Sequence, residues 1–423
     1  MPISTAAGRQ QLGLGGKGFD SNWVNNYNGV NFSTYESNRY NKSKEYIEED
    51  IDFPNNQATV AYGGYATFNI DRRIDKSSRW ELSVTRSALT CGAGGVNPCF
   101  NDFEGYSSID YIEFTYANVK FHLTSGEMLF QDMVTGFTMN RDQRQTQAQL
   151  QAGYLSRSRR VANAKNPLNW IADLQVPWDD LEKKFPHFAI PDDIKVKVQF
   201  KNLIACTLSA DVPVCNILSC VLRLHGEHLI ADEQSSLWNQ VNSGEGIKIK
   251  MTSSVFQNRA IIPTGTTGIF KIKMPNIKNS VIYLIVTLRP TTSLDVNATL
   301  DLQNYVLADQ IYLTDNGTAF TVPRDITANN FYLLNRINRA CFPDSQYGLP
   351  MMVVPFVREE HVMASKNHCL GDRDFSEYNN CELNLVFNSA ISSALYCDIR
   401  AVGHNVLEYN KGFVRTEAAL FST

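Results

Sequence analysis

Short runs of alternating apolar and polar residues dominate this chain. In IKVKVQF (194–200) every second residue is apolar and the residues between them are Lys, Lys and Gln, which is the pattern of a half-buried β-strand. Further strand-like runs occur at 65–73, 80–86, 119–123, 220–230, 247–251, 269–274, 281–290, 351–357, 382–387 and 395–409. Helical patterns do not alternate with these runs, so a parallel α/β sheet is excluded and an all-β fold is predicted.

The chain length and the spacing of the runs predict two domains in series. A chain of 423 residues exceeds one ordinary core and fits two domains of roughly 200 residues each. The runs are separated by long loops rich in Asn, Asp, Gly and Thr, which favours jelly-roll sandwiches. A helix is expected at 141–154. The expected organisation is an extended arm (1–45), a first jelly roll (46–230), a linker helix (231–240), a second jelly roll (241–410) and a tail (411–423).

Charge and cysteine usage narrow the class of protein. The formal net charge of −4 gives no sign of a surface that grips DNA throughout. The N-terminus lacks a charged start followed by an apolar segment, so no secretory signal is expected, and the longest apolar run, Val281–Leu288, fits a buried strand rather than a membrane span. The nine scattered cysteines predict reduced thiols in an intracellular product, with Cys91 and Cys99 as a possible local disulfide around CGAGGVNPC.

Motifs for catalysis or metal binding are weak. LGLGGKG (12–18) lacks the preceding strand and the Ser or Thr of a phosphate-binding loop. His225 and His228 are three residues apart in a predicted strand, so they face opposite sides and do not share a metal easily. The remaining candidates fit loop and turn roles better, since the loop group lacks a fourth metal ligand and the paired aspartates follow prolines: His361, His368, Cys369, Asp179, Asp180, Asp192 and Asp193. We therefore expect no enzymatic activity, no metal and no cofactor.

Two groups of side chains are candidates for contacts with other molecules. The first is a basic cluster that is either a solvated helix and loop or a contact for nucleic acid or an acidic neighbour: Arg141, Arg144, Arg157, Arg159 and Arg160. The second group lies in the proline-broken segment Leu168–Pro191, expected to be a long connection between strands. Its aromatic residues either anchor a subunit contact or plug the bottom of one sandwich: Trp170, Trp178, Phe185 and Phe188.

The order of several blocks resembles the double jelly-roll major capsid proteins of small eukaryotic double-stranded DNA viruses and virus-like elements, namely the polinton, adintovirus, virophage and adenovirus-like lineage. The likeness is one of order, spacing and residue chemistry over most of residues 51–410. The late loop departs from it, because ASKNHCLGDRDF stands where a Pro-Ser-Gly-x-x-Asn form is commoner in the large-virus branch. The blocks are TFNIDRRIDKSSRWELSVTRSAL (67–89), VKFHLTSGEMLFQDMVTGFTMNRDQRQTQAQLQAG (119–153), VPWDDLEKKFPHFAIPDDIKVKVQF (176–200), VLRLHGEHLIADEQSSLW (221–238) and MMVVPFVREEHVMASKNHCLGDRDFSEYNNCELNLVF (351–387).

The resemblance implies a structural role in the virion. Two consecutive antiparallel eight-stranded jelly rolls with long loops and a few short helices would make each homotrimer pseudo-hexagonal, and the trimers would tile an icosahedral shell around double-stranded DNA. Implied partners are the chain itself within and between trimers, minor capsid, penton or cement proteins, and the genome or internal proteins at the inner face. The alternative is an all-β carbohydrate- or receptor-binding surface protein such as a fibre, turret or minor capsid component.

Overall fold

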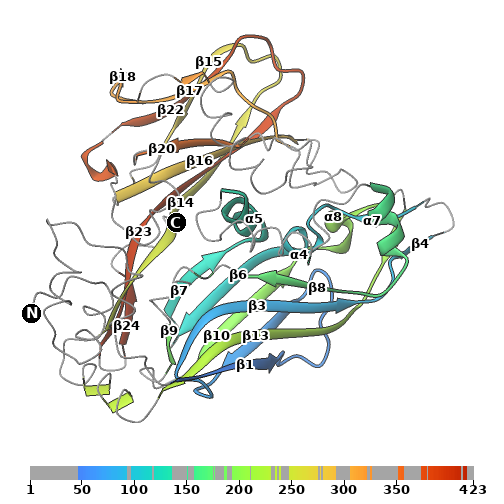
Figure 1. The fold of residues 1–423 in the computed structure, drawn as a ribbon. Coiled ribbons are helices and arrows are strands. Elements are labelled where there is room, and N and C mark those ends of the chain that lie inside the picture. The colour runs from blue at the N-terminus through green and yellow to red at the C-terminus, as the bar shows by residue number, and fades with distance from the viewer. Residues whose placement is uncertain are drawn as a thin grey trace, which may run out of the picture.

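The fold is that of a computed structural model in which two β-sandwiches follow one another along the chain (Figure 1). Strands of residues 46–229 form the first sandwich and strands of residues 247–416 form the second. The structure describes residues 46–92, 97–116, 119–135, 150, 157–174, 176, 185–187, 193–209, 211–229, 234–235, 238–239, 247–274, 277, 280–291, 305–321, 324–325, 351–356, 373–378, 380–410 and 413–416.

The first sandwich has two antiparallel sheets. One has the strand order β1 (Tyr46–Pro54), β13 (Ile217–Leu229), β3 (Lys76–Arg86) and β8 (Leu168–Asp173), with β9 (Phe185–Pro186) added to β3. The other has the order β2 (Tyr65–Ile70), β10 (Ile194–Phe200), β6 (Ile109–Tyr116) and β7 (Val119–Thr124). Two small ribbons pair β12 (Pro213–Val214) with β4 (Thr90–Cys91) and β11 (Thr207–Leu208) with β5 (Cys99–Phe100).

The second sandwich repeats this arrangement. One sheet has the order β14 (Ile247–Ile262), β23 (Leu395–Asn410), β16 (Ser280–Pro290) and β20 (Met352–Pro355), joined by β21 (Arg373–Asp374) and β24 (Phe413–Thr416). The other has the order β15 (Gly268–Lys273), β22 (Cys381–Phe387), β17 (Gln310–Asp315) and β18 (Thr318–Ala319), with β19 (Arg324–Asp325) on β17.

Strand order identifies both sandwiches as jelly rolls. If the main strands of each sandwich are numbered along the chain, one sheet contains strands 1, 8, 3 and 6 and the other contains 2, 7, 4 and 5, in both halves. Strand 1 therefore lies beside 8, 2 beside 7, 3 beside 6 and 4 beside 5, which is how a long folded ribbon wraps into a jelly roll. The two halves thus share one plan, as the sequence predicted for the fold class.

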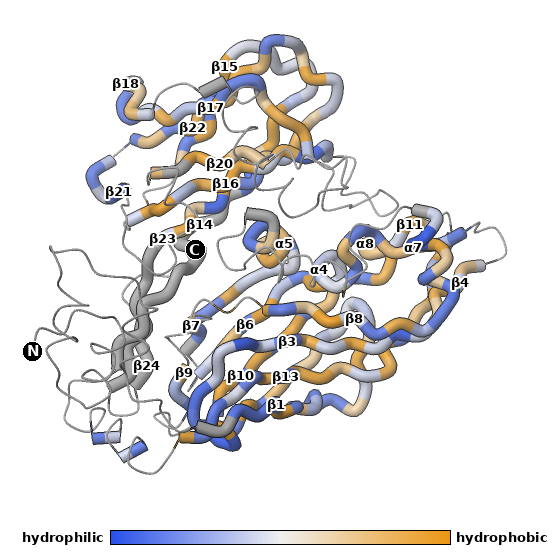
Figure 2. The backbone as a smooth tube through the Cα atoms, in the orientation of Figure 1, coloured by the Kyte–Doolittle hydropathy of each residue, from blue (hydrophilic) through white to orange (hydrophobic). Residues whose placement is uncertain are grey.

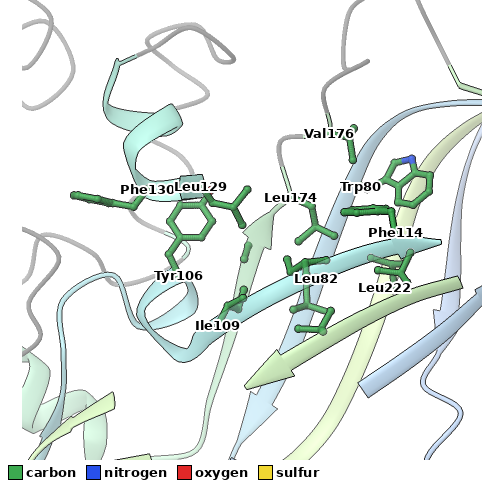
Figure 3. Packing of buried hydrophobic residues seen from close by; sticks show 14 of the residues in the cluster. Trp80, Leu82, Tyr106, Ile109, Phe114, Leu129, Phe130, Leu174, Val176 and Leu222 are labelled. Carbon is green, nitrogen blue, oxygen red and sulfur yellow. The ribbon is translucent and has the colours of Figure 1, made fainter. Parts of the chain in front are cut away.

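Alternation along the strands builds the core between the sheets. β10 shows the predicted pattern, with Ile194, Val196 and Val198 buried and Lys195 exposed. In the close view of the first core, Trp80, Phe114 and Leu222 lie together over the strands, and Tyr106 lies beside Leu129 and Phe130 of a short helix (Figure 3). Figure 2 shows changes of colour between hydrophobic and hydrophilic residues along strands of the first sandwich.

Short helices cover the loop ends of the first sandwich. They are α4 (Glu104–Ser108), α5 (Gly126–Thr135), α7 (Arg157–Ala164) and α8 (Leu203–Cys206), and the second half contributes the 3-10 turn η6 (Phe375–Glu377). Figure 1 places α5 between the two sandwiches, above β6 and β7 and below β16.

The structure corrects several boundaries expected from sequence. β1 at Tyr46–Pro54 was not among the strand-like runs expected from sequence. Leu168–Pro191 is not one long connection, because its first six residues form β8, which pairs with β3. The helix expected at 141–154 lies mostly outside the described residues, and of the linker 231–240 only 234–235 and 238–239 are described and helical. No helix in the described ranges is long and apolar enough to cross a membrane.

Candidate functional site

The aromatic residues expected at subunit contacts divide into two that the structure describes and two that it does not. Trp170 lies in β8 and Phe185 in β9, and neither side chain has any exposed surface. Phe185 packs edge-on against Trp80, with ring centroids 6.1 Å apart. Both residues fill the core of the first sandwich and are not on its surface, whereas Trp178 and Phe188 lie outside the described residues.

The basic cluster is only partly described. Arg159 in α7 is exposed, whereas Arg160 is partly buried and its guanidinium donates a hydrogen bond of 3.3 Å to the main-chain oxygen of Phe100. Arg157 begins α7, and Arg141 and Arg144 lie outside the described residues. Arg160 thus binds a main-chain oxygen at the loop end of its own sandwich, whereas the exposed Arg159 can contact another molecule.

Cys91 and Cys99 lie in separate ribbons. Cys91 is in β4, opposite Pro213 of β12, and Cys99 is in β5, opposite Leu208 of β11. Cys99 is buried and Cys91 is half-buried. A disulfide between them stays a prediction.

His225 and His228 face opposite sides of β13, as predicted, and each has a carboxylate partner on β1. His225 lies between Asp50 and Glu81 on the outer face of the sheet, while His228 Nε2 lies 2.8 Å from Glu49. The neighbouring Glu81 carboxylate, whose oxygen lies 3.6 Å from Nε2, raises the pKa of His225 more than burial lowers it. Among the described residues no group of three or more His, Cys, Asp or Glu side chains is placed to hold a metal ion.

The most heavily charged buried region is the junction between the two sandwiches. Helix α5 of the first half presents its acidic side chains to the sheet of β14, β23, β16 and β20. Arg400 in β23 makes two bonds to Asp132 in α5, of 2.9 and 2.8 Å. A further bond of 3.2 Å runs from Arg400 to the main-chain oxygen of Met128. The guanidinium therefore binds a carboxylate and a main-chain oxygen of the same helix.

A second ion-pair group lies beside it at the start of α5. Arg289 in β16 pairs with Glu127 and lies 3.4 Å from Asp398 in β23. The Tyr305 hydroxyl donates to Glu127 at 3.2 Å. Asp398 also accepts two bonds from Arg259 in β14, of 2.6 and 3.1 Å. These contacts join three strands of the second half to a helix of the first.

Burial and ion pairing shift the pKa values of these groups in opposite directions, and the combined effect of the ion pairs is the larger. Burial by itself would raise the pKa of Glu127, but the nearby Arg289 and Lys201 hold it below its ordinary value. Burial would lower the pKa of Arg400, but Asp132 raises it above the ordinary value. Burial and the charge of Arg400 lower the pKa of the neighbouring His122 to about 3, so this imidazole stays neutral. The junction therefore carries complementary fixed charges at neutral pH.

Apolar packing accompanies the charges. The core of the first half continues into the second through a set of buried residues: Ile282, Tyr283, Ile285, Tyr305, Met351, Val353 and Val402. The alternate residues of β16, such as Leu284 and Val286, belong to the core of the second sandwich. β16 is thus buried on both faces, because one face packs against the core of the first sandwich and the other belongs to the separate core of the second.

Sequence reasoning missed the junction residues. Asp398 and Arg400 interrupt the apolar strand YCDIRAV on alternate positions, so both face the same side. A charged pair on one face of an otherwise apolar strand was the available signal, because such residues are rarely buried without partners. The partners of Arg400 on α5 are 268 to 272 positions away, and Asp398 pairs with Arg289 of β16, which is 109 positions away. None of these partners carries a local sign of the pairing.

A surface pocket lies near the turn between β2 and β3. Its described lining consists of Arg72, Asp75, Gln234, Ser235 and Trp238. Gln234 donates a hydrogen bond of 2.8 Å to Asp75, so the helical segment after β13 is tied to this turn. The contact stabilises the end of the first sandwich.

Comparison with known proteins finds the same fold in viral capsids. A chain of the PBCV-1 virus capsid is 13% identical, covers 90% of this chain and 98% of its own length, and superposes with a TM-score of 0.65. The Faustovirus major capsid protein is 9% identical, with 88% and 92% covered and a TM-score of 0.65. A chain of the Sputnik virophage is 9% identical, with 90% of each chain covered and a TM-score of 0.56. No family model and no curated protein matches by sequence. The chain therefore has the double jelly-roll fold of these structures.

Proposed function

We propose that this double jelly-roll chain is the major capsid protein of a double-stranded DNA virus or virus-like element. The observation that carries the proposal is the extent of the structural match, which includes both sandwiches and 98% of a chain from the PBCV-1 virus capsid. A binding module would need only one sandwich, whereas both sandwiches and the junction between them are matched here. The protein would be located in the virion.

The junction supports this role physically. In this proposal three chains contribute six sandwiches to one pseudo-hexagonal trimer, so the angle between the two sandwiches of a chain must be constant. Paired charges and shared apolar packing across α5 and β16 resist a hinge motion, because opening them would leave buried charges unpaired. A rigid pair of sandwiches is suited to tiling.

We further propose the domain limits stated above, with residues 1–45 outside the two jelly rolls, and with the difference that β24 of the expected tail pairs with β23 and belongs to the second sandwich. Other copies of the chain are the main partners within and between trimers. Minor capsid, penton or cement proteins, and the genome or internal proteins at the inner face, are the additional partners. Arg159 is a candidate contact for an acidic neighbour, because it is an exposed cation at the loop end.

The solution mass of the purified protein tests the proposal. Light scattering should give the mass of three chains of 47.6 kDa, and negative-stain images of the same peak should show hexagonal particles. A monomer at every concentration would contradict the proposal and favour the alternative of a carbohydrate- or receptor-binding module.

A further inference from the structure

An exposed apolar stripe runs along the segment that leads into β13. From Asp211 to Leu218 buried and exposed side chains alternate, and the buried side holds Pro213, Cys215 and Ile217. The outward side holds Val212, Val214, Asn216 and Leu218, and its three apolar residues are 66%, 56% and 61% exposed. Single exposed apolar residues are ordinary, but three on one face of one extended segment form a contiguous patch.

The same segment has an open backbone edge. On one side it follows 86–91, through the pairs Ile217 with Arg86 and Val214 with Thr90. On the other side β1 ends at Pro54, opposite Val221. No strand of the described part of the chain pairs with that side of residues 212–220. The segment therefore combines an edge without a strand partner among the described residues with an apolar face, the combination that accepts an added strand, and Pro213 is its one position without a main-chain donor.

Two other edge strands of this protein are protected by charge. β1 carries the exposed residues Glu48, Glu49 and Asp50, and β15 carries the exposed Lys271 and Lys273. Charges on an edge discourage pairing with another chain. In 211–219 the one charged residue is Asp211, so this edge lacks that protection.

We propose that the open edge at 212–220 is a contact with a second copy of this chain, whose extended backbone it receives. This inference rests on the proposed capsid function, in which every subunit is surrounded by copies of itself. The absence of lysine and arginine from the segment does not fit a polyanion such as nucleic acid. An uncharged apolar strip with free main-chain groups fits instead the apolar centre of an interface between identical subunits.

The test is Val214→Lys, with Ile269→Lys as a matched control. Both residues are 56% exposed, and Ile269 lies in β15 on the second sandwich. Assembly of the full chain is followed by light scattering and negative stain over a concentration series, and far-UV circular dichroism checks the fold. A buried lysine should raise the concentration needed for trimers or shells by about tenfold or more, and Ile269→Lys should leave it unchanged.

The other outcomes are distinguishable. If Val214→Lys assembles as the wild-type chain does, the edge serves a different partner or none, and the inference is overturned while the proposed function stands. If both variants weaken assembly equally, added surface charge is the cause and the assignment to this edge is wrong. If the wild-type chain never assembles, the proposed function fails, and this inference fails with it.

Discussion

Replacing Arg400 by methionine is expected to uncouple the two sandwiches. The guanidinium is 8% exposed and its partner Asp132 is 12% exposed. Methionine fills much of the same space but donates no hydrogen bond, so Asp132 loses two bonds and the main-chain oxygen of Met128 loses one. The Asp132 carboxylate then stays buried without the charge of this guanidinium.

The expected loss of stability follows from the burial of this ion pair. Removing one member of a buried ion pair costs about 3–5 kcal/mol of the free energy of unfolding. Arg223 offers a matched control, because it makes two similar bonds to Asp52, of 2.7 and 3.0 Å, with side chains 38% and 49% exposed. Arg223→Met should cost only about 0–1 kcal/mol, as exposed pairs do. Adding Asp132→Asn to Arg400→Met should recover roughly 1–3 kcal/mol, since the unpaired charge is gone.

Guanidinium unfolding followed by two probes measures both stability and coupling. All five tryptophans occur before residue 240, so fluorescence follows the first sandwich while far-UV circular dichroism follows both. In the wild-type chain the two transitions should coincide. In Arg400→Met they should separate, because each sandwich then unfolds more independently.

The predicted coupling is wrong if the free energy of unfolding of Arg400→Met lies within about 0.5 kcal/mol of the wild-type value, as for a surface substitution, and if the transitions of the two probes still coincide. It is also refuted if Arg223→Met costs as much as Arg400→Met. Either result would mean that burial at the junction does not control the strength of these pairs.

Three further predictions concern other parts of the molecule. The raised pKa of His225 means that its stabilising contacts with Asp50 and Glu81 are complete below pH 6.5 and are lost as the pH rises through the folded-state value. The gap in melting temperature between wild type and His225→Asn should therefore shrink from pH 6 to pH 9, and a gap that is constant with pH would contradict this. Gly126→Ala should cost about 1–3 kcal/mol or more, because an added Cβ would lie 1.9 Å from a main-chain oxygen of α4; thermal unfolding at wild-type stability would show that α5 can shift. Deleting residues 1–40 should leave trimers intact by light scattering and impair shells in negative stain, and dissociated trimers would instead place this arm in the trimer contact.

The fold class could be predicted from sequence because most strands are recognisable from the pattern of their own residues. Alternation at 194–200 and the apolar run at 281–288 both indicate strands from neighbouring residues alone, and both are strands in the structure. β6 was missed, although Ile112, Phe114 and Tyr116 alternate inward, because a short mixed run of Tyr, Glu and Thr is hard to separate from a loop. β8 was missed because LNWIAD is short and stands beside a proline-broken segment.

The junction could not be predicted in the same way. Whether Arg400 is an exposed or a buried cation depends on a helix 268 positions earlier in the chain. Trp170 shows the opposite limitation, since a large aromatic residue beside prolines suits a contact surface and a core equally well. Only its pairing opposite Val84 in the sheet places it inside.

The burial of β16 on both faces has a consequence for how the chain finds its register. In an ordinary half-buried strand, a slip of the pairing by one residue would move polar side chains into the core. The alternation of apolar and polar residues therefore makes the slipped pairing unfavourable. Residues 281–286 are apolar at every position, and a slip there would exchange one apolar face for the other. The ends of the strand must supply the missing specificity. At one end the pairing with β23 shifts between Val281 and Tyr283, and at the other Arg289 finds Glu127 and Asp398 in only one alignment. We therefore expect the ion pairs of the junction to fix the alignment of the central strand β16 while the chain folds.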